Sequence, residues 1–171
     1  MSNDSKRSRK VGTMNKPGIQ TKGSGFTIIE VVLVLAIAGL IFLMVFLALP
    51  ALQRSQRDTQ RKTDVSRFMS QLSSYQSNNR GNVPPSGSIN SFVTSYLNVG
   101  TDSFTDPQTG DPYTVRNTSG SVPTAGSVYY VNGTTATCTA GAPSASGSAA
   151  NGRKVAVAIG LEGGGAYCQT N

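Results

Sequence analysis

The sequence predicts an α+β protein in which a long N-terminal helix packs on a small antiparallel sheet. Residues 26–49 contain only two polar side chains, Thr27 and Glu30, and no glycine interrupts residues 41–79. Further along, residues 154–161 alternate between large and small apolar side chains, which is typical of a strand. One helix of roughly 50 residues followed by short strands accounts for these three observations.

By composition the chain divides into four parts. Residues 1–25 form a basic leader, with six Lys or Arg side chains against one acid and no apolar periodicity. Residues 26–49 would be about 36 Å long as a helix. This exceeds the roughly 30 Å hydrocarbon core of a bilayer, so we expect a transmembrane segment there. Residues 50–80 continue as an amphipathic helix, and residues 81–171 form a globular C-terminal region.

The amphipathic part carries an apolar stripe at helical spacing, which should face the globular region. The stripe consists of Val65, Phe68, Met69, Leu72 and Tyr75. Asp58 lies four residues from both Arg54 and Lys62, an arrangement that suits an exposed helical face. Pro50 lacks an amide donor and should kink or locally melt the long helix; alternatively, it opens a second helix.

The C-terminal region should contain three to five short strands. Asn132-Gly133 lies between two β-forming runs, residues 127–131 and 134–139, and predicts a hairpin. Residues 140–151 are small and predict a loop. Residues 154–161 predict a strand whose Val155, Val157 and Ile159 face the helix, and residues 166–170 predict a last strand.

Composition excludes several classes of site. The chain has no His, which removes His-based triads and His-ligated zinc. Its two Cys are too few for a four-cysteine zinc site and are not in a CxxC arrangement. No nucleophile–base pair is visible, so we expect a structural protein without catalytic residues, metal or cofactor.

The segment before the apolar run is the most informative part of the sequence: Gly25-Phe26-Thr27-Ile28-Ile29-Glu30. It resembles the class III signal of type IV pilins and pseudopilins. The resemblance implies that a prepilin peptidase cuts after Gly25 on the cytoplasmic side and methylates the new N-terminus at Phe26. It also implies a pilin-like fold, and the predicted layout of helix, sheet and C-terminal Cys pair is similar to that family.

The resemblance implies a structural subunit of a type IV pilus that polymerises with identical or related subunits through the N-terminal helix. An assembly platform and its ATPase would drive polymerisation, and the filament would support adhesion, twitching motility or DNA uptake. The subunit would cross the cytoplasmic membrane once before assembly and then join an extracellular filament. The single acid Glu30 would pair with the ammonium of Phe26, in its own or a neighbouring subunit.

Two alternatives remain at this point. The turn at Asp106-Pro107 and Asp111-Pro112 is similar to one common in pseudopilins and simpler pilins. The first alternative draws on this turn: a type II secretion pseudopilin, which assembles a short periplasmic filament. Asp102, Asp106 and Asp111 would then be candidate calcium ligands. The second alternative is a membrane-anchored binding domain that never polymerises, keeps residues 1–25 and has no dependence on Glu30.

The resemblance implies that the C-terminal region lies outside the cytoplasm, where Cys138 and Cys168 should form a disulfide. Free thiols would be expected on the cytoplasmic side. Charge alone favours this orientation only slightly, with six basic residues before the span and four soon after it, Arg54, Arg57, Arg61 and Lys62. That basic run could meet lipid headgroups or DNA, although a solvated helix face is the more ordinary interpretation.

Overall fold

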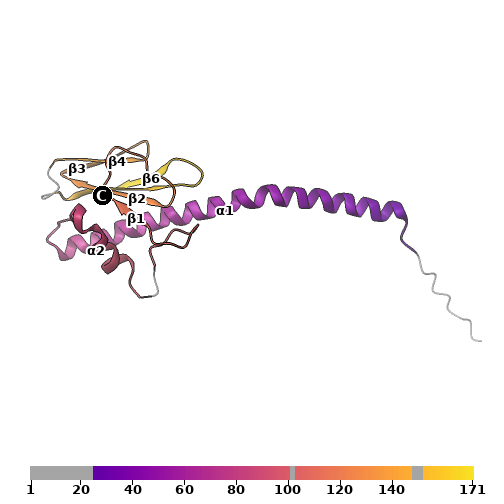
Figure 1. Ribbon diagram of the computed structural model, residues 1–171, viewed down its shortest axis with the longest axis horizontal. Helices are drawn as coiled ribbons and strands as arrows, with labels where there is room; N and C mark the ends of the chain where they lie inside the picture. The colour runs from indigo at the N-terminus through magenta and orange to yellow at the C-terminus, as the bar shows by residue number, and fades with distance from the viewer. Residues whose placement is uncertain (1–24, 101–102, 148–151) are drawn as a thin grey trace, which may run out of the picture. The chain divides into compact units, whose positions relative to one another are not determined.

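The computed structural model describes residues 25–100, 103–147 and 152–171. The leader up to residue 24 and Asp102 lie outside the described residues. The fold is α+β, with one long helix and strands that follow it along the chain (Figure 1). By its contacts the chain divides into two units, Met1–Phe42 and Leu43–Asn171. The elements in chain order are α1 (Ile28–Asn78), α2 (Ile89–Phe92), β1 (Thr114–Arg116), β2 (Ser127–Gly133), β3 (Thr135–Thr139), β4 (Ala142–Ser146), β5 (Lys154–Gly160) and β6 (Ala166–Thr170).

Helix α1 is a single element of 51 residues that includes Pro50, so the alternative of a second helix opening at this proline is wrong. The helix ends where Arg80 and Gly81 both adopt positive φ values, 57° and 82°. The amide of Gly81 donates to the carbonyl of Gln76 at 2.7 Å, which satisfies one of the last helical carbonyls. The helix was predicted to continue to residue 80, and it ends at Asn78.

Strands of the described residues form two sheets. The larger has the order β1-β2-β5-β6 and the smaller is the pair β3-β4. The pairs β2–β5, β5–β6 and β3–β4 are antiparallel, as expected. Strand β1 departs from the prediction because it runs parallel to β2, with Val115 opposite Val128.

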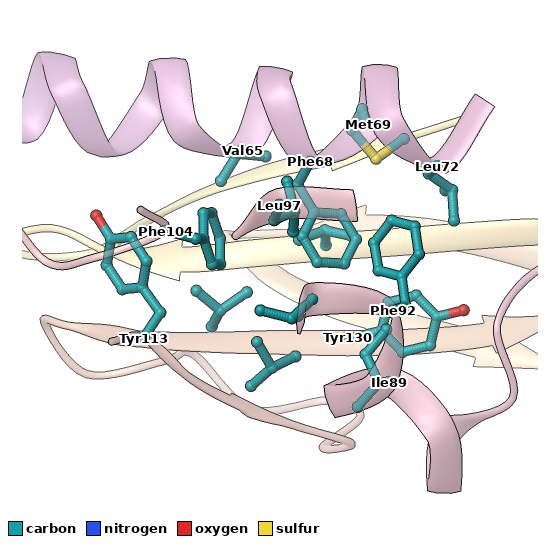
Figure 2. Close-up of a cluster of buried hydrophobic side chains, with 14 of the residues drawn as sticks. Val65, Phe68, Met69, Leu72, Ile89, Phe92, Leu97, Phe104, Tyr113 and Tyr130 are labelled. Carbon is teal, nitrogen blue, oxygen red and sulfur yellow. The ribbon is translucent and has the colours of Figure 1, made fainter. Parts of the chain in front are cut away.

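The core lies between α1 and one face of the larger sheet (Figure 2). The predicted stripe is buried from Val65 to Leu72, and Tyr75 is partly buried at its end. It meets the predicted sheet face of Val155, Val157 and Ile159, whose side chains are all fully buried. Helix α2 and the π-helical turn Val93–Leu97 add further apolar side chains, and the ring of Phe92 lies edge-on to Phe68 at 5.2 Å.

The second face of the larger sheet is also covered, which the alternation in residues 154–161 did not predict. Ala156 and Ala158 are fully buried. Strands β3 and β4 contact β5 on this side, and small side chains allow their close approach. The alternation of large and small side chains therefore indicates a strand that is covered on both faces, by α1 on one and by β3 and β4 on the other, rather than a half-exposed strand.

The predicted hairpin at Asn132-Gly133 is wrong. Both residues stay within β2, where Gly133 pairs with Lys154 of β5. A Cβ on Gly133 would lie 2.5 Å from the carbonyl oxygen of Ser146, so glycine is needed here for close approach of β4. The true hairpin joins β3 to β4 through Ala140-Gly141, both with positive φ, inside the segment predicted to be a loop.

Candidate functional site

The segment carrying the predicted processing motif lies at the start of α1. Gly25, Phe26 and Thr27 precede the helix and are exposed. The amide of Glu30 donates to the Thr27 side-chain oxygen at 3.3 Å, so Thr27 caps the helix. Sequence reasoning missed this cap, although Thr followed three residues later by Glu is a recognisable capping signal.

Glu30 is exposed in the first turn of α1, where a carboxylate also interacts favourably with the helix dipole. Together with Phe26, Val31, Val34 and Leu35 it lines a shallow, almost wholly apolar depression on the helix surface. The structure therefore brings Glu30 and Phe26 to one depression. A helix-capping role and a charge-pairing role are both open to Glu30.

The apolar half of α1 presents large hydrophobic side chains to its surroundings. Ile28 is 85% exposed and Phe46 74% exposed. Among the described residues, α1 is the helix whose length and hydropathy are sufficient to cross a bilayer, and its most apolar stretch is entirely unburied. A surface of this kind is not stable in water and requires lipid or protein contacts.

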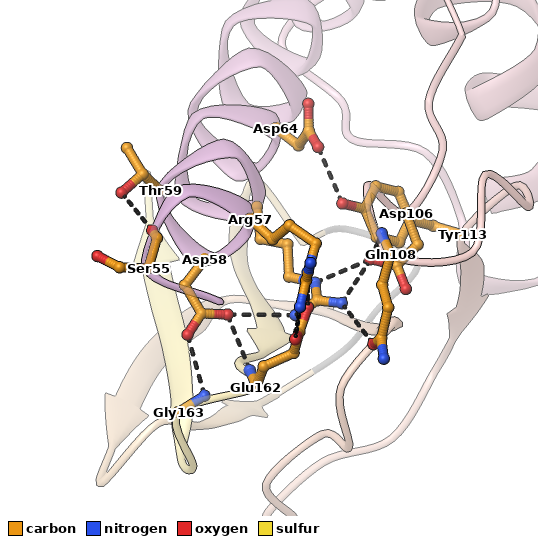
Figure 3. A network of polar contacts seen from close by, with 11 residues as sticks. Ser55, Arg57, Asp58, Thr59, Asp64, Asp106, Gln108, Tyr113, Glu162 and Gly163 are labelled. Carbon is orange, nitrogen blue, oxygen red and sulfur yellow. Dashed lines mark hydrogen bonds and ion pairs between the residues drawn. The ribbon is translucent and has the colours of Figure 1, made fainter. Parts of the chain in front are cut away.

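Beyond this half, a cluster of charged side chains joins α1 to two loops (Figure 3). We call it the charged cluster: Arg57, Asp58 and Arg61 of α1, Asp106 of the loop before β1, and Glu162 of the β5–β6 turn. Arg61 is fully buried at its centre. Its guanidinium donates twice to Asp106 Oδ1, at 2.9 and 2.6 Å, and lies 3.2 Å from Asp58 and 3.0 Å from Glu162.

The rest of the charged cluster holds the β5–β6 turn against the helix. Arg57 donates to both carboxylate oxygens of Glu162 at 2.7 Å, and this interaction, aided by Arg61, holds the pKa of Glu162 below its ordinary value. Asp58 accepts the amides of Glu162 and Gly163 at 2.8 and 3.0 Å. Burial opposes ionisation of Asp58, but these two amides and Arg61 together keep its pKa lowered.

The charged cluster corrects two predictions. Asp58 does not stabilise an exposed helix face with Arg54 and Lys62, because its carboxylate is used by the β5–β6 turn and Arg61. The basic run is likewise not a free cationic face, since Arg57 and Arg61 are neutralised by acids far along the chain. Partners 45 to 105 residues apart leave no local signal in the sequence.

Two further acids lie close to the charged cluster. Asp64 is buried and accepts the hydroxyl of Tyr113 at 2.9 Å; burial, and next the negative charge of Asp64, raises the pKa of Tyr113. Asp106 is bound to Arg61, whereas Asp111 is exposed in the same loop. Among the described residues there is no group of three acidic or sulfur side chains that could hold a metal ion.

The predicted disulfide is present between Cys138 and Cys168, which are 30 residues apart. It links β3 of the smaller sheet to β6 at the edge of the larger sheet. The bond therefore ties the two sheets together.

Comparison of the whole chain with protein-family models, curated proteins and solved structures finds no match in any of the three.

Proposed function

We propose that the chain is a structural subunit of a type IV pilus-like filament. It is made as a membrane-threaded precursor, cut after Gly25 by a prepilin peptidase, methylated at Phe26 and polymerised through the apolar half of α1. The proposal rests on the motif from Gly25 to Glu30. The observation that carries it is the wholly exposed apolar half of a helix whose other half is packed into a globular region.

The exposed apolar half of α1 suits both the membrane-threaded precursor and the assembled subunit. A bilayer and the core of a helical filament are each apolar, so a subunit can exchange lipid contacts for protein contacts without exposing this surface to water. The globular region needs no such cover, because its own core is closed by α1, α2 and the larger sheet.

The conformation around Gly25 supports processing. Gly25 and Phe26 are exposed and precede the helix, which begins at Ile28. A peptidase binds its substrate in an extended form, so the helix around a peptide bond would first have to unwind before that bond could be cut. The Gly25–Phe26 bond needs no such step.

Intact mass and N-terminal sequencing test processing directly. We expect the chain co-expressed with a prepilin peptidase to start at methylated Phe26, with Cys138 and Cys168 together two hydrogens lighter. Gly25→Val should keep the full-length chain, whereas Gly23→Ala, two residues before the cut, should be processed normally. A chain that still begins near Met1 in the presence of an active peptidase overturns the proposal.

The two roles open to Glu30 can be separated by substitution. Glu30→Gln keeps the hydrogen-bonding groups of a capping box but removes the charge, and Glu30→Ala removes both. If Glu30 pairs with the Phe26 ammonium, both variants should insert and be cut normally but yield far fewer filaments. If Glu30 serves only the helix start, Glu30→Gln should assemble like the parent, and Thr27→Val should be impaired like Glu30→Ala.

A secretion pseudopilin is the second candidate, favoured by the loop at Asp106. In this structure the loop fastens to α1 through Arg61 rather than presenting Asp106 to solvent. Filament length distinguishes the two: long surface filaments support a pilin, and short periplasmic ones with a calcium requirement support a pseudopilin. An anchored domain that never polymerises would retain residues 1–25 and tolerate Glu30→Ala.

A further inference from the structure

Three aromatic rings meet near the C-terminal end of α1, where the helix contacts α2 and the π-helical turn that follows it. Tyr75 belongs to α1, Phe92 is the last residue of α2, and Tyr96 lies in the turn. The ring centroids of Tyr75 and Tyr96 are 5.5 Å apart, with 69° between the ring planes. We call these two residues the tyrosine pair; they bring into contact two phenols from separate segments of the chain.

The tyrosine pair is held in place by the core. Phe92 is only 3% exposed and lies beneath α1 (Figure 2). Its ring is edge-on to Tyr75 at 5.6 Å and stacked on Tyr96 at 5.2 Å. Arg67 of α1 also donates to the carbonyl of Leu97, which fastens the turn to the helix. The contact between the two phenols is therefore set by packed neighbours and not by two loose surface side chains.

Both members of the tyrosine pair also reach solvent. Tyr75 and Tyr96 are partly buried at the rim of the core. Neither hydroxyl has a hydrogen-bond partner among the described residues, and neither belongs to the buried polar atoms that lack one. Both oxygens are therefore open to water, so an oxidant can reach the tyrosine pair and water can accept the phenol protons.

The other four tyrosines lack this combination of contact and access. Tyr113 and Tyr130 are buried, and each hydroxyl donates to a protein oxygen. Tyr129 and Tyr167 are partly buried but have no ring contact with a tyrosine. Of the aromatic contacts between described residues, the one within the tyrosine pair is the only one that joins two tyrosines. Oxidation should therefore act selectively at this place.

Two phenols in contact couple when each loses one electron and its hydroxyl proton. The two phenoxyl radicals join through the ring carbons next to the oxygen-bearing carbons, and each of these carbons then passes its hydrogen to the oxygen, which restores both hydroxyls. With hydrogen peroxide as the oxidant, the two electrons and two protons reduce one peroxide to two waters. Partly exposed rings reorient within nanoseconds, so edge-on rings reach the coupling geometry, and their existing contact raises the effective concentration.

We propose that the tyrosine pair is a dityrosine site, at which peroxide and a haem peroxidase join Tyr75 to Tyr96. The new carbon–carbon bond staples the end of α1 to the turn after α2, as the disulfide between Cys138 and Cys168 ties the two sheets together. Both bonds form under oxidising conditions. The reaction needs the folded globular region and not polymerisation, so the dityrosine site stands or falls separately from the proposed filament.

The experiment treats the full chain in neutral detergent with hydrogen peroxide and a haem peroxidase, then digests it with trypsin. We expect the tryptic peptides 68–80 and 81–116 to be linked, with two hydrogens fewer than their summed mass. Peptide 81–116 contains Tyr96 and Tyr113, and fragmentation should place the bond at Tyr96. Denaturing electrophoresis should show a monomer, because both phenols belong to one chain.

Conservative variants test the site without disturbing the packing of its rings. Tyr75→Phe and Tyr96→Phe each keep the ring but remove the phenol, and each should lower the yield of dityrosine fluorescence and linked peptide about 10-fold or more. Tyr167→Phe is the matched control, because it removes a partly buried tyrosine outside the tyrosine pair and should leave the yield unchanged.

Stapling is measured by the Tm after oxidation. A cross-link that closes a loop of this length should raise the Tm of the oxidised parent by about 10 °C over that of oxidised Tyr75→Phe, in which methionine oxidation is the same. Equal Tm values overturn the staple. Equal dityrosine yields in the parent and Tyr75→Phe, or links mainly between chains, overturn the site, as does a parent without linked peptide while the same enzyme couples free tyrosine.

Discussion

Removal of the Asp106 carboxylate tests whether the charged cluster fastens the loop before β1 to α1. Asp106 Oδ1 accepts two hydrogen bonds from Arg61, whose side chain is fully buried. A hydrogen bond to a charged group contributes about 1.5–3 kcal/mol. Arg61 retains Asp58 and Glu162 in Asp106→Ala, so the loss stays below that of an unpaired buried charge. We expect the free energy of unfolding to fall by about 2–4 kcal/mol.

The loss can be measured by thermal unfolding of the full chain in neutral detergent, followed by near-UV circular dichroism of its six tyrosines. A loss of this size lowers the Tm by about 10 °C for a region of this length. Asp111→Ala is the matched control, because this exposed acid in the same loop should cost less than about 0.5 kcal/mol. Equal Tm values for the two variants would refute the reasoning.

A double-mutant cycle separates the Arg61–Asp106 interaction from other effects of each change. Arg61→Leu alone leaves three carboxylates of the charged cluster facing one another around Arg57, and should destabilise by about 3–5 kcal/mol. Adding Asp106→Ala removes part of that repulsion. The two losses should therefore fail to add by at least about 1 kcal/mol. Additive losses would mean that the two side chains act independently despite their contact.

Three further predictions concern the stability of the globular region. Cys138→Ser with Cys168→Ser should lower the free energy of unfolding by about 3–4 kcal/mol, and dithiothreitol should give the same Tm as this double variant. The pKa of Glu162 is lowered in the folded protein, so ionised Glu162 adds to the free energy of unfolding above its unfolded pKa of about 4.3. This stabilisation is lost as the pH falls through the folded pKa. The Tm should therefore be flat from pH 6 to 8 and drop below about pH 4.5. Gly160→Ala would place a Cβ 2.1 Å from the Thr124 carbonyl oxygen and should lower the free energy of unfolding by about 3 kcal/mol. Gly87→Ala is the control: its Cβ would have no atom within 4 Å, so its Tm should stay close to that of the parent.

The elements that the sequence predicts well are those whose pattern has one dominant cause. The stripe from Val65 to Leu72 repeats with the helical period because a single face is buried, and the structure buries that face. The strand from Lys154 to Gly160 was also predicted, and the helix ends within two residues of the predicted position. In each case local backbone geometry and burial favour the same residues, so local reasoning is sufficient.

Glycines were harder to interpret because they have two uses. Asn132-Gly133 has the composition of a tight turn, but Gly133 is required by the carbonyl of Ser146 in β4. The real turn, Ala140-Gly141, has an alanine in a left-handed conformation, which turn preferences do not predict. A close approach between strands depends on the tertiary fold, so the sequence around either glycine cannot distinguish the two uses.

Charged residues were hardest, because the same composition along α1 serves opposite purposes. Arg57 and Arg61 appeared to be members of an exposed basic run, yet acids from two distant loops neutralise them. Arg80 and Arg153 are 73 residues apart and gave no signal in the sequence, yet both line one polar groove at the end of α1. Arg54 and Lys62 of the same basic run stay exposed, so one run holds both neutralised and exposed cations.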